Sequence, residues 1–546
     1  MFLNDAKVWE NIRKSAKYKP LRDKIEKEYE NICKDKPIPK ITFKLETEFL
    51  RTGNRTKFEK VYFGKRRQLT LYTLMLLLYP ENIEYKEGLE EVICDICNEY
   101  SWELPAHHPA EYFNKRNSID LYSAETGFYL AEVKALFTDK LHPYVIERIT
   151  NELRWRIIDS FKNNTFFFET CKSNWAAVCG GSVGAVFLYE SPKEHNQVFQ
   201  RIYKIMMNYV DGLSDDGATS EGNSYWRYGF GFYVLYADLL RRYSCGRMDL
   251  FRDDKVKKAA GFFNSICLDN KNIVSFSDST TTLAYQPFIT GYLNEEYGIE
   301  LPPAEGKYIE YNELSYALRS CIYYYPEQKP KKLMPMKKHY DKLQWYIERR
   351  DKYSFAAKGG HNAEEHNHND VGSFIVTHNN KMIFSDLGAP EYTAQSWSAD
   401  SYDTVLNKSS LGHSVPIIDG KAQKCGRDYC GELTVDGDKI NIEMAKAYDA
   451  GIIGLSRSFE LSESSIALCD IFTGATKVTE RFITEIEPEI NEGSVSIAGV
   501  KLVYDAKHKF SCTYEDIKAH DGVTVRRVYK LDFDVSGNEF KMTVVF

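Results

Sequence analysis

Three histidines fall within eight residues of one polar stretch, GGHNAEEHNHNDVG, which begins at Gly359. His366 and His368 are two positions apart, so in an extended chain their side chains would point to the same face. A surface loop does not need this concentration of imidazole groups in order to fold. We therefore consider two interpretations of the stretch: a site for a divalent metal ion, and a polar loop held by hydrogen bonds.

Two later residues of the chain, Asp386 and His413, could complete a metal site with His368. Asp386 ends the next strand of a predicted hairpin, and His413 lies in a later loop, LGHSVP. Two imidazoles and one carboxylate drawn from separate segments suit zinc or a similar divalent ion. The spacing alone does not decide between metal binding and a hydrogen-bonded loop.

A second group of candidate residues lies in the first half of the chain. Asn174 precedes a run of small residues, WAAVCGGSVGAVFL, which would allow close packing of helices. Farther on, the stretch DGATSEGNSYWRYG carries Glu221, Tyr225, Trp226 and Tyr228 at the start of another predicted helix. Taken alone, a glycine-rich helix connection with aromatic packing explains these residues as well as a binding site does.

The elements that would position these residues change character along the chain. Between about residues 65 and 325, segments such as LTLYTLMLLLYP and FYVLYADLLRRY carry apolar residues at helical spacing. The breaks between them are short, and no strand-like alternation intervenes. We therefore predict that residues 1–325 form a helical domain, an incomplete (α/α) toroid built from helical hairpins.

The stretch YYYPEQKPKKLMPM, residues 323–336, is rich in proline and lysine and marks the predicted domain boundary. After it, apolar and polar residues alternate, and HNNK, VDGDK and SGNE read as hairpin turns. Residues 326–546 are accordingly predicted to form an antiparallel β-sandwich. The fold class is α+β with two domains.

The composition excludes some classes of partner. The net charge of the 546 residues is −7 and no long basic stripe occurs, so a nucleic-acid ligand is not expected. Aromatic residues make up 14%, including 38 tyrosines. This content suits a groove that stacks on sugar rings, although tyrosines that only line helix interfaces would explain it too.

The first 32 residues contain no apolar run long enough for a signal peptide or a membrane span. A cytoplasmic protein with no membrane partner is the resulting prediction. A signal peptide removed ahead of this sequence would instead place the protein in the periplasm or outside the cell. The 12 scattered cysteines are expected to be reduced core thiols.

Several of these segments together resemble the heparinase II/III-like polysaccharide lyases. They are IDLYSAETGFYLAE, NWAAVCGGSVGAVFL, DGATSEGNSYWRYG and, most specifically, HNHNDVGSFIV followed by FSDLG and GHSVPIIDG. The likeness spans about residues 100–425. It implies a helical toroid followed by a β-sandwich, and an enzyme that depolymerises an acidic glycan such as heparan sulfate, chondroitin, hyaluronan or alginate.

The resemblance also implies roles for individual residues. Asn174 would neutralise the carboxylate of a uronic acid, and His366 would act as a base or bind the acidic group. Tyr228 would donate a proton to the departing oxygen, and Tyr225 is a competitor for that role. The implied substrate contacts are Glu221, Trp226 and Tyr392, together with Tyr225.

His368, Asp386 and His413 resemble the ligands of that family's structural metal, which implies one divalent ion, zinc first, with calcium and manganese as alternatives. The implied reaction is β-elimination, in which charge builds up next to an existing carboxylate and must be stabilised. The implied active site needs both domains. Self-association into a homo-oligomer is left open.

Two rival functions are considered. A glycoside hydrolase on a helical toroid could use Asp215, Asp216 and Glu221 as acid and base, and its product would lack a double bond. That reading gives the HNHND stretch no task. A noncatalytic glycan-binding protein is the second rival, and the joint presence of Asn174, Tyr228 and His366 argues against it.

Overall fold

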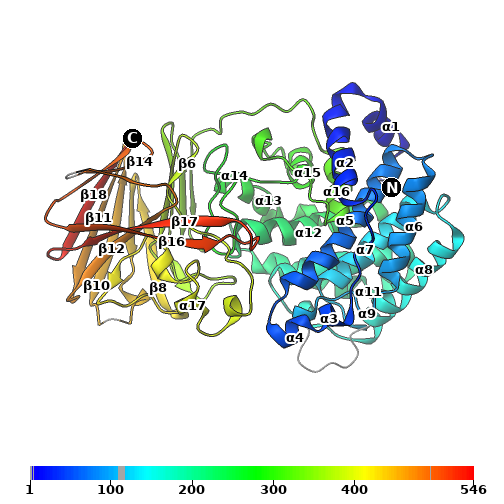
Figure 1. Ribbon diagram of the computed structural model, residues 1–546, viewed down its shortest axis with the longest axis horizontal. Helices are drawn as coiled ribbons and strands as arrows, with labels where there is room; N and C mark the ends of the chain where they lie inside the picture. Colours follow the sequence, from blue (N-terminus) through cyan, green and yellow to red (C-terminus); the bar gives the residue numbers. More distant parts are fainter. Residues whose placement is uncertain (1–2, 4, 108–116, 450, 492–493) are drawn as a thin grey trace. The chain divides into compact units, whose positions relative to one another are not determined.

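The computed structural model describes residues 3, 5–107, 117–449, 451–491 and 494–546. Its contacts divide the chain into two compact units (Figure 1). The helical unit comprises Met1–Leu213, Arg227–Ala260 and Tyr285–Lys329. The sheet unit comprises Ser214–Trp226, Gly261–Ala284 and Pro330–Phe546.

Two stretches that precede residue 326 in sequence, Ser214–Trp226 and Gly261–Ala284, make their contacts within the sheet unit. The predicted boundary at residues 325 and 326 puts both of them in the helical half. Apolar periodicity cannot detect such an exchange, because it reports the local element and not the element's packing partner.

The helical unit contains the helices of the first 330 residues, apart from the short α14. Their bounds are α1 (Ala6–Lys14), α2 (Lys19–Ile32), α3 (Phe43–Glu46), α4 (Glu48–Thr52), α5 (Thr56–Leu78), α6 (Ile83–Cys97), α7 (Leu121–Phe137), α8 (Pro143–Leu153), α9 (Ser160–Asn163), α10 (Asn174–Glu190), α11 (Pro192–Gly212), α12 (Gly222–Tyr243), α13 (Asp254–Ala260), α15 (Pro287–Tyr297) and α16 (Leu314–Ile322). The first turn of α12 belongs to the sheet unit. In the described part of the chain, no helix is both long and apolar enough to span a bilayer.

Helix α10 owes its close packing to its small residues. A Cβ added at Gly180 would lie 2.6 Å from Cγ2 of Ile205 in α11, and one added at Gly184 would overlap the ring of Tyr236 in α12. Larger side chains at these positions would push the neighbouring helices apart. The predicted close packing of the AAVCGGSVGAVFL run is therefore confirmed.

Helix α7 starts at a capping box. The carboxylate of Asp120 accepts a hydrogen bond from the Ser123 backbone N–H at 2.7 Å, and the Ser123 hydroxyl accepts one from the Asp120 N–H at 2.9 Å. This reciprocal pair satisfies two of the backbone donors that a helix start leaves open. Most of α7 is buried, so its polar residues must find partners inside the unit.

The sheet unit contains α14 (Phe262–Ile266), α17 (Ser401–Thr404) and three sheets. The five-stranded sheet has the order β1 (Met336–Tyr340), β2 (Trp345–Arg349), β3 (Tyr353–Lys358), β5 (Phe374–His378), β6 (Lys381–Phe384). The nine-stranded sheet has the order β13 (Glu489–Asn491), β14 (Ser494–Ile497), β15 (Val500–Tyr504), β18 (Glu539–Val545), β11 (Ser465–Thr473), β10 (Gly454–Leu461), β9 (Lys439–Glu443), β8 (Gly426–Asp436), β4 (Gly360–Asn362). The four-stranded sheet has the order β16 (Lys509–Lys518), β17 (Val525–Asp534), β12 (Val478–Thr484), β7 (Ile417–Ile418).

Neighbouring strands in these sheets pair antiparallel, as the alternating pattern predicts. The predicted HNNK turn joins β5 to β6, and both of its asparagines, Asn379 and Asn380, have positive φ angles of 50° and 58°. Such angles are typical of a tight hairpin. One hydrophobic core holds Phe355 of the first sheet, Leu468 of the second and Phe482 of the third, so the sheets enclose a common interior.

A buried arginine ties that interior to two loops. The Arg457 guanidinium donates to the carboxylates of Asp470 and Glu480 at 2.7 and 2.9 Å. It also donates to the backbone oxygens of Gly372, at 2.9 Å, and Ser414, at 2.6 Å. Burial and the neighbouring Asp470 hold the pKa of Glu480 well above its usual range. Gly372 and Ser414 belong to the two stretches that the sequence marks by their histidines.

We predict that Arg457→Met lowers the free energy of unfolding by about 3–5 kcal/mol, because it leaves the buried Asp470 carboxylate without its cation and the buried Glu480 carboxyl without its hydrogen-bond donor. Denaturant unfolding measures the change. Arg527→Met is the matched control, since Arg527 pairs with Asp516 on the exposed β16–β17 ribbon. The control should barely move the unfolding midpoint. Equal losses in the two variants would contradict the anchoring role of Arg457.

Candidate active site and metal centre

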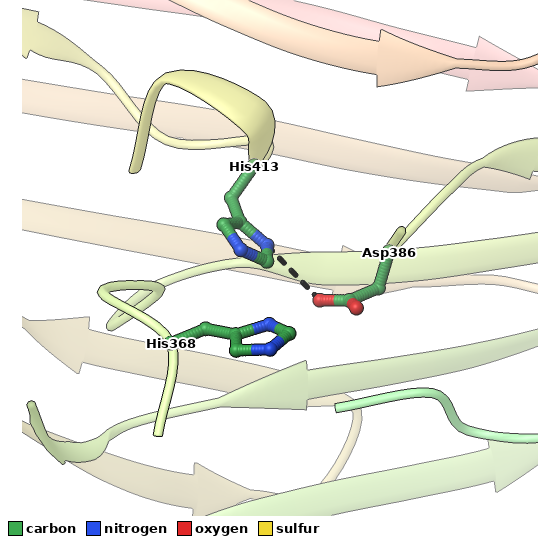
Figure 2. Close-up of side chains that lie close together, drawn as sticks. All are labelled: His368, Asp386 and His413. Atoms are coloured by element: carbon green, nitrogen blue, oxygen red, sulfur yellow. Dashed lines mark ion pairs between the residues drawn. The ribbon is translucent and has the colours of Figure 1, made fainter. Parts of the chain in front are cut away.

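Three side chains from separate segments converge inside the sheet unit (Figure 2). His368 lies between β4 and β5, Asp386 follows β6, and His413 follows the short helical turn Ser410–Gly412. All three side chains are fully buried. One ligand atom of each lies within 4.8 Å of those of the other two. The structure thus brings together the three residues that the sequence predicts as metal ligands.

In each residue of this trio, the polar atom that points away from the other two residues is hydrogen-bonded. The Nε2 atom of His368 contacts Oδ1 of Asp278 at 3.1 Å, and Nε2 of His413 contacts the Asn407 backbone oxygen at 2.7 Å. The Asp386 Oδ1 atom accepts from the Gly388 N–H at 2.9 Å. Partners of this kind orient metal ligands in proteins by holding the far side of each ligand group.

The inward-facing atoms are those that a metal would need. Among the described residues, Nδ1 of His368 has no hydrogen-bond partner although it is buried. Nδ1 of His413 and Oδ2 of Asp386 lie 3.0 Å apart as an ion pair but lack hydrogen-bond geometry. Burial alone would raise the pKa of Asp386, yet the nearby His413 imidazole holds it below its usual value. A buried set of two imidazoles and one carboxylate with these inward atoms could bind a metal ion.

Asp278 is the residue that links this trio to the rest of the site. Its Oδ1 contacts His368, and its Oδ2 contacts Nδ1 of His366 at 3.0 Å and accepts from the Tyr392 hydroxyl at 2.8 Å. Burial alone would raise the pKa of this carboxyl, but the two imidazoles hold it well below its usual range. Sequence reasoning missed Asp278. Its only signal was an acidic residue inside the polar run SDSTTT that follows an apolar stretch.

His366 itself has an unusual backbone. Its φ angle is +56°, in the left-handed region that residues other than glycine seldom adopt. Its ring stacks on that of Tyr225 with centroids 3.8 Å apart, and its Nε2 lies 4.0 Å from Oε1 of Glu221. Because Nδ1 is engaged by Asp278, a neutral His366 keeps its lone pair on Nε2, where it can accept a proton.

Glycine at position 222 brings Tyr225 and Asp278 together. Gly222 has a φ of +82°, and a Cβ there would lie 2.9 Å from the Phe276 backbone oxygen. The next backbone N–H, of Asn223, donates to the Ser279 hydroxyl at 2.7 Å. The first turn of α12 is therefore fixed against the segment that carries Asp278.

The predicted substrate contacts fall into different surroundings. The Tyr225 hydroxyl lies 2.9 Å from that of Tyr392, so both belong to the group around His366. The ring of Trp397, which is 51% exposed, meets the His366 ring edge-on at 6.1 Å. Trp226 is only 1% exposed and stacks on Phe263, so its position gives no support to a substrate contact.

In the helical unit the structure places Asn174 next to the helix turn of Tyr228. Asn174 is the first residue of α10 and is buried, and a Cβ at Gly229 of α12 would lie 3.0 Å from its Cα and Cβ atoms. The Tyr228 hydroxyl donates to the carboxylate of Glu125 in α7. Burial and this carboxylate hold the pKa of Tyr228 well above its usual value.

Glu125 is a second residue that sequence reasoning missed, although it stands inside the IDLYSAETGFYLAE stretch. It is 4% exposed and accepts a second hydrogen bond, from Tyr129, at 2.6 Å. Burial raises its pKa to about 8, and the two tyrosine hydroxyls offset part of that effect. A buried acid among apolar helix residues leaves no periodic pattern in the sequence.

Comparison with known proteins identifies the core of the sheet unit. Residues 334–509 match the sequence model of the family described as heparinase II/III-like, C-terminal. This stretch is a heparinase II/III-like C-terminal domain. The resemblance predicted from the sequence is thus confirmed, and the domain includes His366, His368, Asp386 and His413. A comparison with curated proteins found no match.

Solved structures of similar fold extend over nearly the whole chain. A heparinase III structure aligns with a TM-score of 0.64 at 13% identity, covering 99% of this chain and 91% of the other. Heparan sulfate lyase HepC from Pedobacter heparinus aligns with 0.58 at 12%, covering 99% and 92%. Chondroitin AC lyase from Streptomyces coelicolor A3 aligns with 0.57 at 11%, covering 99% and 82%. At these identities the likeness is one of fold.

We predict that His413→Ala removes a bound divalent metal and lowers the melting temperature of the protein, because the ligand set loses one of its three buried donors. Elemental analysis and melting curves, with and without a chelator, measure both effects. His361→Ala is the control, since it removes a histidine of the same polar stretch that lies outside the buried trio.

A metal-free but fully stable wild-type protein would contradict this prediction. Loss of the metal at an unchanged melting temperature would show instead that the ion does not brace the heparinase-like domain.

We predict that Asp278→Asn weakens metal binding about 10–100-fold, the usual scale for removing a carboxylate behind a histidine ligand. The variant should also lower turnover, because His366 loses the acceptor that orients its ring. Metal titration and steady-state kinetics measure the two effects separately. Asp403→Asn, at an exposed position of α17, is the control. Unchanged metal affinity would show that Asp278 does not support His368.

Proposed function

We propose that the protein is a polysaccharide lyase that cleaves a uronic-acid-containing glycan by β-elimination and leaves an unsaturated uronyl end. The observation that carries the proposal is the backbone conformation of His366 together with the orientation of its ring. This histidine lies in a heparinase II/III-like domain, keeps a rare backbone conformation, and has one ring nitrogen held by a buried carboxylate. A strained, oriented imidazole in a family of this name is best explained by a task in proton transfer.

The proposed reaction removes the C5 proton of the uronate and expels the oxygen on C4. His366 takes the C5 proton on Nε2, and Tyr228 gives its phenolic proton to the leaving oxygen as the C4–O bond breaks. The Asn174 side chain donates a hydrogen bond to the substrate carboxylate, which gains negative charge in the transition state. Glu221, Tyr225 and Tyr392 lie around His366 and are proposed to contact the sugar.

The contact with Glu125 supports the proposed role of Tyr228 as the general acid. A tyrosine that served as the base would have to lose its proton before the reaction. Burial makes that loss harder because it raises the pKa of Tyr228, and Glu125 raises this pKa further once it is ionised. The alternative tyrosine, Tyr225, has its hydroxyl against Tyr392 and its ring against His366, an arrangement that suits orientation of the imidazole.

We further propose that the trio of His368, Asp386 and His413 holds one zinc ion, with calcium or manganese as the alternatives. Nitrogen donors from two imidazoles favour zinc over the harder cations. When bound, the ion would brace the loop that presents His366. The helical unit, in which α10 packs against α7 and α11 and also contacts α12, is proposed to form an incomplete (α/α) toroid.

The substrate class is proposed as an acidic glycan, because the structures of similar fold carry names that refer to heparan sulfate and chondroitin. The test is to incubate the protein with heparan sulfate, chondroitin, hyaluronan and alginate and to record ultraviolet absorbance of the conjugated product. A lyase produces this absorbance together with new chain ends. New chain ends without it would identify a hydrolase and overturn the proposal.

We predict that Tyr228→Phe lowers turnover by about 100-fold or more while folding and glycan binding are kept, since the variant keeps the ring and loses only the hydroxyl that is the acid and that bonds to Glu125. Rates on the substrate found above, together with a binding isotherm, measure the two effects. Tyr225→Phe is the matched comparison three residues away. Near-normal turnover of the Tyr228 variant with an inactive Tyr225 variant would transfer the acid role to Tyr225.

A further inference from the structure

We propose that Glu125 is the proton partner of Tyr228: its carboxyl group resupplies the proton that Tyr228 gives to the leaving oxygen. The proposal rests on the lyase function proposed above and adds a residue to it. In this role Glu125 would act through Tyr228 and would not touch the sugar.

The geometry singles out this carboxyl. Glu125 lies in the buried interior of α7, and each of its two oxygens accepts a hydrogen bond from a different tyrosine. Oε1 faces Tyr228 of α12, and Oε2 faces Tyr129, one turn farther along α7. Among the described residues, Glu125 takes part in no ion pair with a lysine or arginine. A buried carboxyl without a cation is costly as an anion and has a reason to carry a proton.

The charged and titratable groups around Glu125 favour that protonated form. Acidic neighbours are Glu313 and Asp120, and both raise the pKa of Glu125. Glu313 is itself paired with Arg227, which offsets part of its charge. Other titratable groups whose ionisation interacts with Glu125 include Tyr122 and Tyr129 of α7, Cys179 of α10, Tyr228 of α12 and Tyr316 of α16.

With its pKa raised to about 8, Glu125 is mostly protonated at neutral pH. A protonated Glu125 can donate along the same contact through which its anion accepts from Tyr228. The Tyr228 O–H is then directed away from Glu125, as a proton donor to the leaving oxygen must be. The pair is thus arranged for two proton transfers in series.

The C4–O bond breaks with its electron pair on the leaving oxygen, and that oxygen takes the Tyr228 proton. The phenolate oxygen takes the Glu125 proton, which leaves Glu125 as a carboxylate. The C5 proton passes to His366, and the electron pair of the broken C5–H bond forms the C4=C5 double bond. Solvent then reprotonates Glu125, and His366 releases its proton, so that the resting state returns without an oxidant or a reductant.

The experiment compares pH–rate profiles of the wild-type protein, Glu125→Gln and Tyr129→Phe. Wild-type turnover should fall as pH rises through about 8, where Glu125 loses its proton. Glu125→Gln cannot relay a proton, so we expect turnover about 10–100-fold lower and no such alkaline limb. Tyr129→Phe removes a hydrogen bond that lowers the pKa of Glu125, so its alkaline limb should move to higher pH.

A second measurement does not depend on substrate. A carboxyl whose pKa is raised on folding stabilises the native state fully below its unfolded pKa, near 4.5, and this contribution is lost as pH rises through about 8. The melting temperature of Glu125→Gln minus that of the wild type should therefore increase across this window. A constant difference would overturn the protonated state of Glu125.

The outcomes separate the two proposals. A wild-type protein with no lyase activity on the uronate glycans would reject the proposed function. An active wild type, with a Glu125→Gln variant that keeps both its turnover and its alkaline limb, would reject the role of Glu125 alone. A shifted limb in Tyr129→Phe would support the relay, since a merely structural glutamate would not move it.

Discussion

One carboxylate, that of Asp278, organises the sheet unit's candidate site. Its two oxygens contact two imidazoles, those of His366 and His368, and one of them also accepts from the Tyr392 hydroxyl. In a buried environment such short charge-assisted contacts are stronger than in water. A single group therefore determines which ring nitrogen of His366 points outward and how His368 is turned toward Asp386 and His413.

This arrangement lowers the stability of the folded domain, and contacts elsewhere in the domain have to compensate for the loss. His366 keeps a left-handed backbone, and the trio of metal-ligand candidates is withdrawn from solvent. Arg457 supplies part of the compensation, because it binds the backbone oxygens of Gly372 and Ser414 from within the common core of the sheets. The loops that carry the histidines are thereby attached to strands whose apolar burial stabilises the domain.

In the helical unit, the environment of a tyrosine decides its chemistry. A phenol in water is a poor acid and, once ionised, a good base. Burial against Glu125 makes ionisation of Tyr228 unfavourable, so the group is held as a proton donor. The same burial raises the pKa of Glu125 to about 8, close to neutrality, which is the range in which a carboxyl can exchange protons during turnover.

The sequence by itself determined the helical and antiparallel-sheet elements, because apolar spacing reports which face of a local element is buried. It also determined the identity of the metal-ligand candidates, since His368, Asp386 and His413 stand in stretches whose polarity has no local explanation. Tertiary structure alone decided the rest. Asp278 and Glu125 are single acids in ordinary surroundings along the chain, and their importance comes from neighbours 90 and 103 residues away. Trp226 shows the converse: it is an aromatic residue in a suggestive motif, and only the fold decides that its side chain is 1% exposed, because burial depends on which segments meet in space and a linear pattern does not record that.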